Sequence, residues 1–284
     1  MTSKIEKVNK SCLECNQEYE AHIGDALGIK IEFGGGYCPT CRQKKLDEEE
    51  RIEFEARQKE TASKRENWRG ECGIPLRFRE SRVDKFDTKV DKSIVNMWHE
   101  CGEYINQFSF SKPQGVKSLV MYSQGIWGVG KTYLACAISN GILDKWDNET
   151  GLCPVCFVSE PQLFLRVRST YNRRGNDDRN HQETEEEIYR HLTRVPLLIL
   201  DDVGKEEVSD PRFVQRVLFA VIDGRYQNML PMVITANLNP DELDLHLGGN
   251  RGNSASMDRL TEMTGNIFWE LRGQSYRDMS KRNG

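Results

Sequence analysis

The chain has 284 residues, which is long enough for one complete α/β domain and a small accessory module. Its net charge of −4 excludes a globally basic nucleic-acid binder, so contact with DNA or RNA would need a local basic patch. No apolar stretch approaches the roughly 18 residues of a membrane span, and the charged N-terminus does not look like a signal peptide. Nine cysteines in such a chain favour reduced thiols or metal ligands, and a cytoplasmic location, over disulfides.

Two close cysteine pairs mark residues 1–45, which we expect to form a zinc-binding module. Cys12-Leu-Glu-Cys15 and Cys38-Pro-Thr-Cys41 are separated by 22 residues. Two such pairs supply the four thiolates of a tetrahedral Zn²⁺ and leave no open position, which indicates a structural site. So short a segment cannot bury a core by itself, so the metal would supply the folding energy. Four free thiols, or an iron–sulfur cluster, are the alternatives.

Residues 46–70 form a strongly charged segment that contains neither Gly nor Pro before Gly70. Helix-forming residues dominate it, and its apolar residues are too sparse for a buried face. We predict a solvated helical linker, and a partner-binding helix that uses Ile52 and Phe54 is the alternative.

From residue 71 to the end of the chain, short apolar runs alternate with segments of helical periodicity. Strands are expected at residues 118–122, 153–158, 197–201 and 232–235, and helices at 133–143, 161–171 and 213–222. This alternation predicts an α/β domain with a parallel sheet covered by helices on both faces. Cys153 and Cys156 lie in one of the strands, so we interpret them as structural thiols.

A glycine-rich loop follows the first of these strands. Gly125-Ile-Trp-Gly-Val-Gly130-Lys131-Thr132 has the spacing of a phosphate-binding P-loop, in the strand–loop–helix context that the motif requires. Its backbone N–H groups would face the phosphates, Lys131 would reach the β- and γ-phosphates of ATP, and Thr132 would ligate Mg²⁺. The predicted nucleotide contacts are Gly125, Gly128, Val129, Gly130, Lys131, Thr132 and Tyr133.

Polar residues stand at the ends of two later predicted strands, those at residues 197–201 and 232–235. Asp201 would hold Mg²⁺, and Asp202 would orient or deprotonate the attacking water. Asn237 could hydrogen-bond the γ-phosphate or that water, although Asn before Leu-Asn-Pro is also ordinary turn chemistry.

Further landmarks join these motifs in a fixed order. They are Gly73-Ile-Pro, Phe86, Asp201-Asp-Val-Gly204, Arg225, Met257-Asp-Arg259-Leu, Trp269 and Ser275-Tyr-Arg277. From Gly73 to Arg277 the chain resembles the bacterial replicative helicase loaders of the DnaC/DnaI type and their phage versions, and the zinc module favours a phage-encoded one. The resemblance implies an AAA+ ATPase domain over residues 71–284, preceded by the zinc module and the linker. It also implies that the protein loads a hexameric replicative helicase onto single-stranded DNA when replication begins.

The same resemblance assigns catalytic roles to residues outside the P-loop. Asn237 matches the sensor 1 position, and Arg277 matches sensor 2, which closes on the subunit's own ATP. Arg259 matches the arginine finger, offered to ATP on a neighbouring subunit, so it implies self-association through ATP-bridged interfaces. Many AAA+ proteins carry Glu where this chain has Asp202, and the shorter side chain favours slow hydrolysis. Each arginine could instead be an ordinary surface residue.

Two other functional classes remain open. A transposition helper ATPase of the IstB type, which acts on duplex DNA, shares the core motifs, although the zinc module weighs against it. A non-enzymatic zinc adaptor, in which ATP is only a structural switch, would be separated from both by its lack of DNA-stimulated turnover.

A basic segment with interleaved aromatics is a candidate contact for single-stranded DNA. It comprises Phe164, Arg166, Arg168, Tyr171, Arg173, Arg174 and Arg179. The alternative is a solvated face that is balanced by Asp177, Asp178 and the acidic residues at 183–187.

Overall fold

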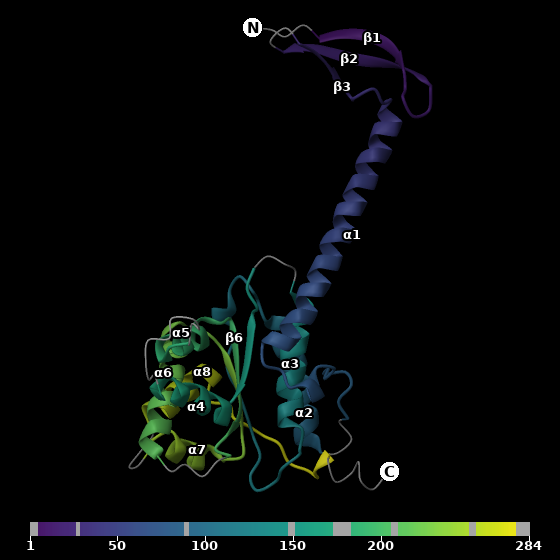
Figure 1. The fold of residues 1–284 in the computed structure, drawn as a ribbon. Helices are drawn as coiled ribbons and strands as arrows, with labels where there is room; N and C mark the ends of the chain where they lie inside the picture. The colour runs from purple at the N-terminus through teal and green to yellow at the C-terminus, as the bar shows by residue number, and fades with distance from the viewer. Residues whose placement is uncertain are drawn as a thin grey trace. The chain divides into compact units, whose positions relative to one another are not determined.

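The computed structural model of the chain describes residues 5–26, 29–87, 91–146, 151–172, 183–205, 210–249 and 254–276. It divides into two compact units, Met1–Ser63 and Lys64–Gly284. Helix α1 (Pro39–Glu71) begins in the first unit and ends in the second (Figure 1). This helix covers the charged linker, but it starts earlier than expected, between the two cysteines of the second pair. The three-part division at residues 45 and 70 stays a prediction. None of the described helices has the length and apolar character of a membrane span.

An antiparallel sheet, which the sequence analysis did not predict, precedes helix α1 in the first unit. Its strands β1 (Ile5–Ser11), β2 (Glu18–Ala26) and β3 (Ile29–Phe33) are arranged in the order β1-β2-β3. Exposed ion pairs connect residues on different strands of this sheet, including Lys7 with Glu20 at 2.7 Å and Lys30 with Glu6 at 3.0 Å. Such pairs contribute little individually, so this sheet needs another source of stability.

The second unit contains the predicted parallel sheet, with five strands in the order β5-β6-β7-β4-β8. The strands are β4 (Leu119–Tyr122), β5 (Val155–Ser159), β6 (Leu197–Val203), β7 (Met232–Ala236) and β8 (Trp269–Glu270). All four predicted strands are present within a few residues of their expected bounds. β8 was not predicted, because two residues are too short to show periodicity.

Both faces of this sheet are buried, because alternate residues of each strand enter different apolar clusters. Leu198 and Leu200 of β6 belong to one cluster, whereas Leu197 and Ile199 belong to the other. Helices α4 to α8 cover the first face, and α2 and α3 cover the second (Figure 1). This double cover explains why the strands are almost continuously apolar.

The helices around the sheet confirm the predicted α/β alternation. They are α2 (Lys92–Gln107), α3 (Lys131–Lys145), α4 (Glu160–Ser169), α5 (Glu185–Arg194), α6 (Pro211–Gln227), α7 (Pro240–His246) and α8 (Ala255–Thr264). Polar residues cap several of them, and capping boxes at Ser159, Thr184 and Asn239 start α4, α5 and α7. These caps satisfy N–H groups that the first helical turn leaves unpaired.

Arg225 has an unexpected place inside α6, which runs five residues beyond its predicted end at residue 222. Its side chain is fully buried and donates hydrogen bonds to the carbonyl oxygens of Leu192, Val195, Pro196 and Pro231. Burial lowers the pKa of this guanidinium to about 9. Arg225 therefore joins the chain segments that lead into β6 and β7, the two strands that end in the predicted catalytic residues.

Candidate functional site

The glycine-rich loop joins the end of β4 to the first residue of α3, as its motif requires. Gly130 caps this helix with φ +98°, a left-handed conformation that favours glycine. A Cβ at this position would lie 2.5 Å from Cζ of Phe86, so the loop and Phe86 are in direct contact. The N-terminus of α3 thus begins at Lys131, with the polarity that favours a bound phosphate.

Lys131 is buried in the wall of the site rather than extended into solvent. Its Nζ donates to Oγ of Ser123 and, over 2.9 Å, to Oδ1 of Asn237. Ser123 is itself buried at the end of β4 and donates to the carbonyl oxygen of Ile126. The structure thus brings Lys131 and Asn237 together, and it adds Ser123, which the sequence analysis did not single out.

Asp201 lies at the end of β6, against the first turn of α3. The Thr132 hydroxyl is 3.1 Å from its Oδ1, and the buried Thr235 hydroxyl donates to the same oxygen over 2.5 Å. Burial raises the pKa of Asp201 to about 6, and the charge of Asp202 acts in the same direction. The Thr132 and Asp201 oxygens are hard ligands that lie close together, so these residues fit Mg²⁺.

Asp202 is held in an unusual backbone conformation directly after Asp201. Its φ is +58°, and the pairing of β6 with β7 is irregular between Leu200 and Val203. The Asp202 N–H donates to Oγ1 of Thr235 over 2.9 Å. Its carboxylate is only partly buried and pairs with Lys205 Nζ at 2.8 Å. Asp202 therefore stands at a strand irregularity of the kind found at functional sites, and it lines the same cavity as Thr132.

The turn after Asp202 is fixed by a buried carboxylate that sequence reasoning missed. Glu160 is fully buried. Its carboxylate accepts a hydrogen bond from the Gly204 N–H over 2.9 Å and another from Nε2 of His246 over 2.7 Å. Gly204 has φ +74°, and a Cβ there would lie 2.2 Å from a side-chain atom of Leu238. One signal could have pointed to Glu160, because it directly follows a buried strand, as Asn237 does.

A cavity of about 430 Å³ lies at this site, with Asp201 and Glu160 behind the residues that line it. Lys131, Thr132, Asp202, Lys205 and Asn237 form its polar end. Phe78, Phe86, Tyr133 and Tyr276 form an aromatic wall elsewhere in the same cavity. The Phe86 ring is 5.0 Å from that of Tyr133 and 5.2 Å from that of Tyr276. A polar end that suits phosphates and an aromatic wall that suits a base together fit a nucleotide.

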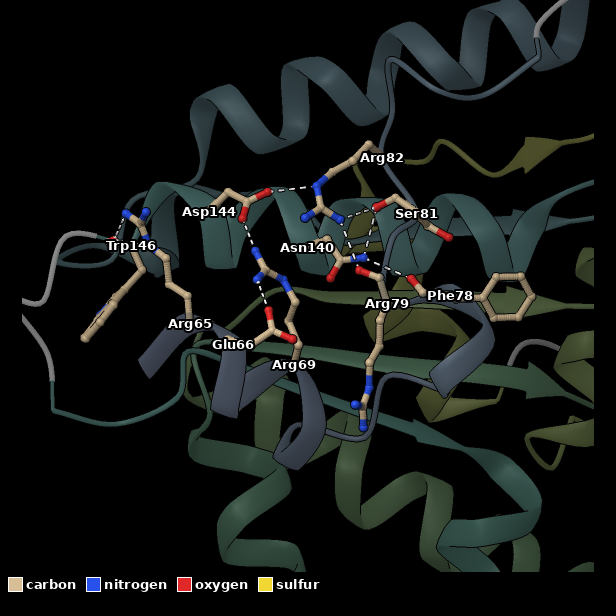
Figure 2. Close-up of polar contacts among 10 residues, drawn as sticks. All are labelled: Arg65, Glu66, Arg69, Phe78, Arg79, Ser81, Arg82, Asn140, Asp144 and Trp146. Carbon is tan, nitrogen blue, oxygen red and sulfur yellow. Dashed lines mark hydrogen bonds and ion pairs between the residues drawn. The ribbon is translucent and has the colours of Figure 1, made fainter. Parts of the chain in front are cut away.

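Helix α3 also positions the wall of this cavity (Figure 2). Nδ2 of Asn140 donates to the carbonyl oxygens of Phe78 and Ser81, over 3.1 and 2.9 Å. The chain segment that carries Phe78 is thereby attached to the helix that begins at the phosphate loop.

The opposite end of α3 is held by arginines from α1 and from the segment after it. One carboxylate oxygen of Asp144 accepts a hydrogen bond from Arg69, and the other pairs with Nε of Arg82 at 2.9 Å (Figure 2). Nε of Arg65 donates to the Trp146 carbonyl oxygen over 2.9 Å. Cations at a helix C-terminus are stabilising, so these contacts fix α3 at the end away from the loop.

The two predicted catalytic arginines differ in what the structure describes of them. Arg259 lies on α8, where Nε is 2.8 Å from Oδ1 of Asp223 and the guanidinium lies over the rings of Phe219 and Tyr226. It is not among the described residues that line the cavity of its own chain. Arg277 lies outside the described residues.

The four cysteines of the first unit gather at one place. Their Sγ atoms lie within 4.8 Å of one another, and those of Cys15 and Cys38 are 3.7 Å apart. A tetrahedral zinc ion with Zn–S bonds of about 2.3 Å would separate its sulfurs by about 3.8 Å. Backbone hydrogen bonds lower the pKa of the Cys12 thiol to about 6 against the effect of burial, whereas hydrogen bonds with Cys15 and Cys38 raise the pKa of Cys41 to about 12. These residues therefore fit Zn²⁺.

The basic segment is only partly described. Arg166 donates to Glu183 over 2.7 Å, and Arg168 stacks on the Phe213 ring at 4.6 Å. Arg173, Arg174 and Arg179 lie outside the described residues. One predicted DNA-contacting charge is thus already paired with an acidic residue of the same chain.

Comparison with known proteins agrees with this fold and site. Residues 116–284, more than half of the chain, match the family described as IstB-like ATP binding protein. The chain therefore belongs to the IstB-like ATP-binding family and has the AAA+ fold.

Two curated relatives and one solved structure are similar to the chain. The replicative helicase loader DnaI of Bacillus subtilis is 26% identical, over 51% of this chain and 41% of its own length. The replicative helicase loader DnaC of Escherichia coli is 25% identical, over 64% of each chain. A crystal structure of the DnaC helicase loader superposes with a TM-score of 0.53 and 22% identity, covering 70% of this chain and all of that one. The chain spans less than two thirds of the length of either curated relative.

Proposed function

We propose that this protein is an ATP-dependent loader that places a hexameric replicative helicase on single-stranded DNA when replication begins. The observation that carries the proposal is the joining of Lys131, Thr132, Asp202 and Asn237 in one cavity with an aromatic wall. Membership of an ATP-binding family and similarity to two replicative helicase loaders support it. Such a role implies a cytoplasmic location.

ATP hydrolysis by this site would use the chain's own residues in distinct roles. Thr132 and Asp201 would hold Mg²⁺, which supplies charge neutralisation at the phosphates. Lys131 would bind the β- and γ-phosphates and exchange its contacts with Ser123 and Asn237 for them. Asp202 would orient the attacking water and accept its proton, with Asn237 beside it. Because Asp202 is short and already paired with Lys205, we expect slow turnover.

The arginines complete the proposal in an assembly of several copies. Arg259 would serve the ATP of a neighbouring subunit, after its contact with Asp223 is broken. Arg277 would close on the ATP of its own subunit. A delocalised guanidinium suits the charge that spreads over a transferring phosphoryl group.

The parts outside the ATPase core would contact the partners. We propose residues 1–70, with their zinc module, as the arm that docks on the helicase. Arg168, together with the predicted arginines after it, would contact the backbone of single-stranded DNA, while Tyr171 stacks on a base. Phe164, the other aromatic predicted for this contact, is instead buried in the core.

Capture of a hexameric helicase by the full-length protein tests the proposal. ATP-dependent capture, followed by helicase transfer to single-stranded DNA, is the expected result, and Lys131→Ala should abolish the ATP dependence. Turnover stimulated by duplex DNA without helicase capture would instead favour a transposition helper of the IstB type. Absence of any turnover would favour the zinc adaptor.

A further inference from the structure

Lys205 is one of the cavity-lining cations that have no role in the proposed chemistry so far. Its side chain is more than half exposed, and its Nζ pairs with Oδ2 of Asp202 at 2.8 Å. Both residues line the polar end of the cavity, together with Lys131 and Asn237. Lys205 is therefore an ammonium group in the same cavity as Lys131, the residue proposed to bind the γ-phosphate.

The backbone that carries Lys205 is fixed from two sides. Thr235 accepts the Asp202 N–H, and the fully buried Glu160 accepts the Gly204 N–H. Gly204 has no room for a side chain, because Leu238 fills the space. The start of the Lys205 side chain is thus positioned by buried contacts, whereas its four-carbon stem remains free to turn.

The ion pair between Lys205 and Asp202 is also weak enough for Lys205 to exchange Asp202 for another anionic partner. It is solvent-accessible on both sides, and exposed ion pairs typically contribute less than about 1 kcal/mol. A γ-phosphate carries more charge than one carboxylate and offers more acceptor oxygens, so it would compete well for the same ammonium.

We propose that Lys205 is a specificity-determining residue that distinguishes ATP from ADP. When ADP is bound, the Lys205 ammonium remains paired with Asp202. When ATP is bound, the ammonium pairs with the γ-phosphate oxygens instead, and the Asp202 carboxylate is left open to the attacking water. Lys205 thereby couples recognition of the triphosphate to release of the catalytic carboxylate. This inference rests on the proposed ATPase site, but not on the identity of the protein partner.

Equilibrium binding of ATP and ADP to the full chain, in the presence of Mg²⁺, tests the proposal. Lys205→Gln should weaken ATP binding about tenfold, the effect of losing one charge-assisted hydrogen bond, while ADP affinity changes by less than about twofold. Lys85→Gln is the matched control, because Lys85 also lines the cavity but lies in the segment that carries Phe86. It should leave the ratio of ATP to ADP affinity unchanged.

Asp202→Asn adds a second, independent test. Loss of the carboxylate should strengthen ATP binding, partly because Lys205 is released from its partner. That gain should be smaller in the Lys205→Gln background, and the difference measures the coupling between the two residues. Lys205→Arg should retain most of the ATP preference.

An unchanged ATP-to-ADP ratio in Lys205→Gln would overturn the role of Lys205 and leave the loader function standing. An equal loss of both nucleotides would also overturn it, because it would indicate a purely structural contribution. If the unsubstituted protein bound neither nucleotide, the proposed ATPase would fail together with this inference.

Discussion

In the first unit, the buried side chains gather around Cys12, Cys38 and Cys41, with Tyr19 and Tyr37 packed against them. In the second unit, two large apolar clusters cover both faces of a parallel sheet. The strands of the first unit meanwhile leave Phe33 more than half exposed, so that unit has little apolar area to bury. Hydrophobic burial can stabilise the second unit alone, whereas we expect the first to depend on an ion bound by its cysteines.

In the second unit, the residues that stabilise the fold differ from those that form the site. In the first unit, the same residues do both. In the second unit the polar residues of the cavity stand at strand ends or at the start of α3, outside the apolar clusters that hold the strands. Cys12 and Cys38 are at once the core and the predicted ligands of the first unit. A change at the site should therefore spare the fold of the second unit and destroy that of the first.

The largest expected effect is loss of zinc. Cys38→Ser should lower the zinc content from about one equivalent to less than half and unfold the first unit, because metal binding supplies on the order of 10 kcal/mol to such modules. Nucleotide binding should stay within about twofold of normal. Metal analysis and hydrogen exchange, read separately for residues 5–63 and 64–276, measure both outcomes.

Cys153→Ser provides the matched control, since Cys153 belongs to a similarly spaced pair in the second unit. It should keep its zinc. Less than half an equivalent of zinc in the reduced, unsubstituted protein would contradict the metal site.

Substitution of Arg259 should have a large effect on ATP turnover and no effect on stability. Arg259→Ala should lower ATP turnover about 10³-fold, as loss of other arginine fingers does, and leave ATP binding by its own subunit nearly intact. Mixing this variant with Lys131→Ala should partly restore activity. In the mixed interface, the Lys131 variant offers its intact finger to the intact phosphate loop of the Arg259 variant.

Two results would contradict this role in trans. One is a mixture that stays as inactive as either variant although both co-assemble. The other is loss of ATP binding by Arg259→Ala alone, which would assign the residue to its own subunit's pocket.

A smaller effect is expected at Asn140, where core and site of the second unit meet. Asn140→Leu leaves the carbonyl groups of Phe78 and Ser81 without their donor, so it should lower the free energy of unfolding by about 1–3 kcal/mol. ATP affinity should fall several-fold because Phe78 lines the cavity, and zinc content should not change. Chemical denaturation and nucleotide titration measure this, with the exposed Asn106→Leu as control. Loss of stability without loss of affinity would show that the wall is not positioned through Asn140.

The smallest effect is expected on the surface of the first unit. Lys7→Gln removes an exposed ion pair with Glu20 and should change stability by less than about 0.5 kcal/mol. Zinc affinity, measured by competition with a chelator, should stay within about twofold. A tenfold loss would mean that the charged sheet, rather than the metal, stabilises this unit.

Local patterns identified much of the second unit in advance. The strands that end near Asp201 and Asn237 are long apolar runs, and the loop helix starts where the glycine motif places it. The β1–β3 sheet was missed although β2 alternates Tyr19, Ala21 and Ile23 with polar residues, a pattern that indicates a strand. Many of the intervening residues are charged, and the cysteine spacing alone was used to interpret this segment. Helices α2, α5, α7 and α8 were missed as well.

The sequence by itself determined that four cysteines could share one ion, and that Lys131, Asp201 and Asn237 lie close to the ends of strands of one sheet. Both conclusions depend on spacing and on the rule that parallel strands end at the same edge. Only the tertiary structure decided which side chains touch. Lys131 meets Asn237 across 106 residues, Asp201 meets Thr235 across 34, and Glu160 meets Gly204 across 44. Such contacts join residues with no regular spacing between them, and they form because packing of the core brings their strands together.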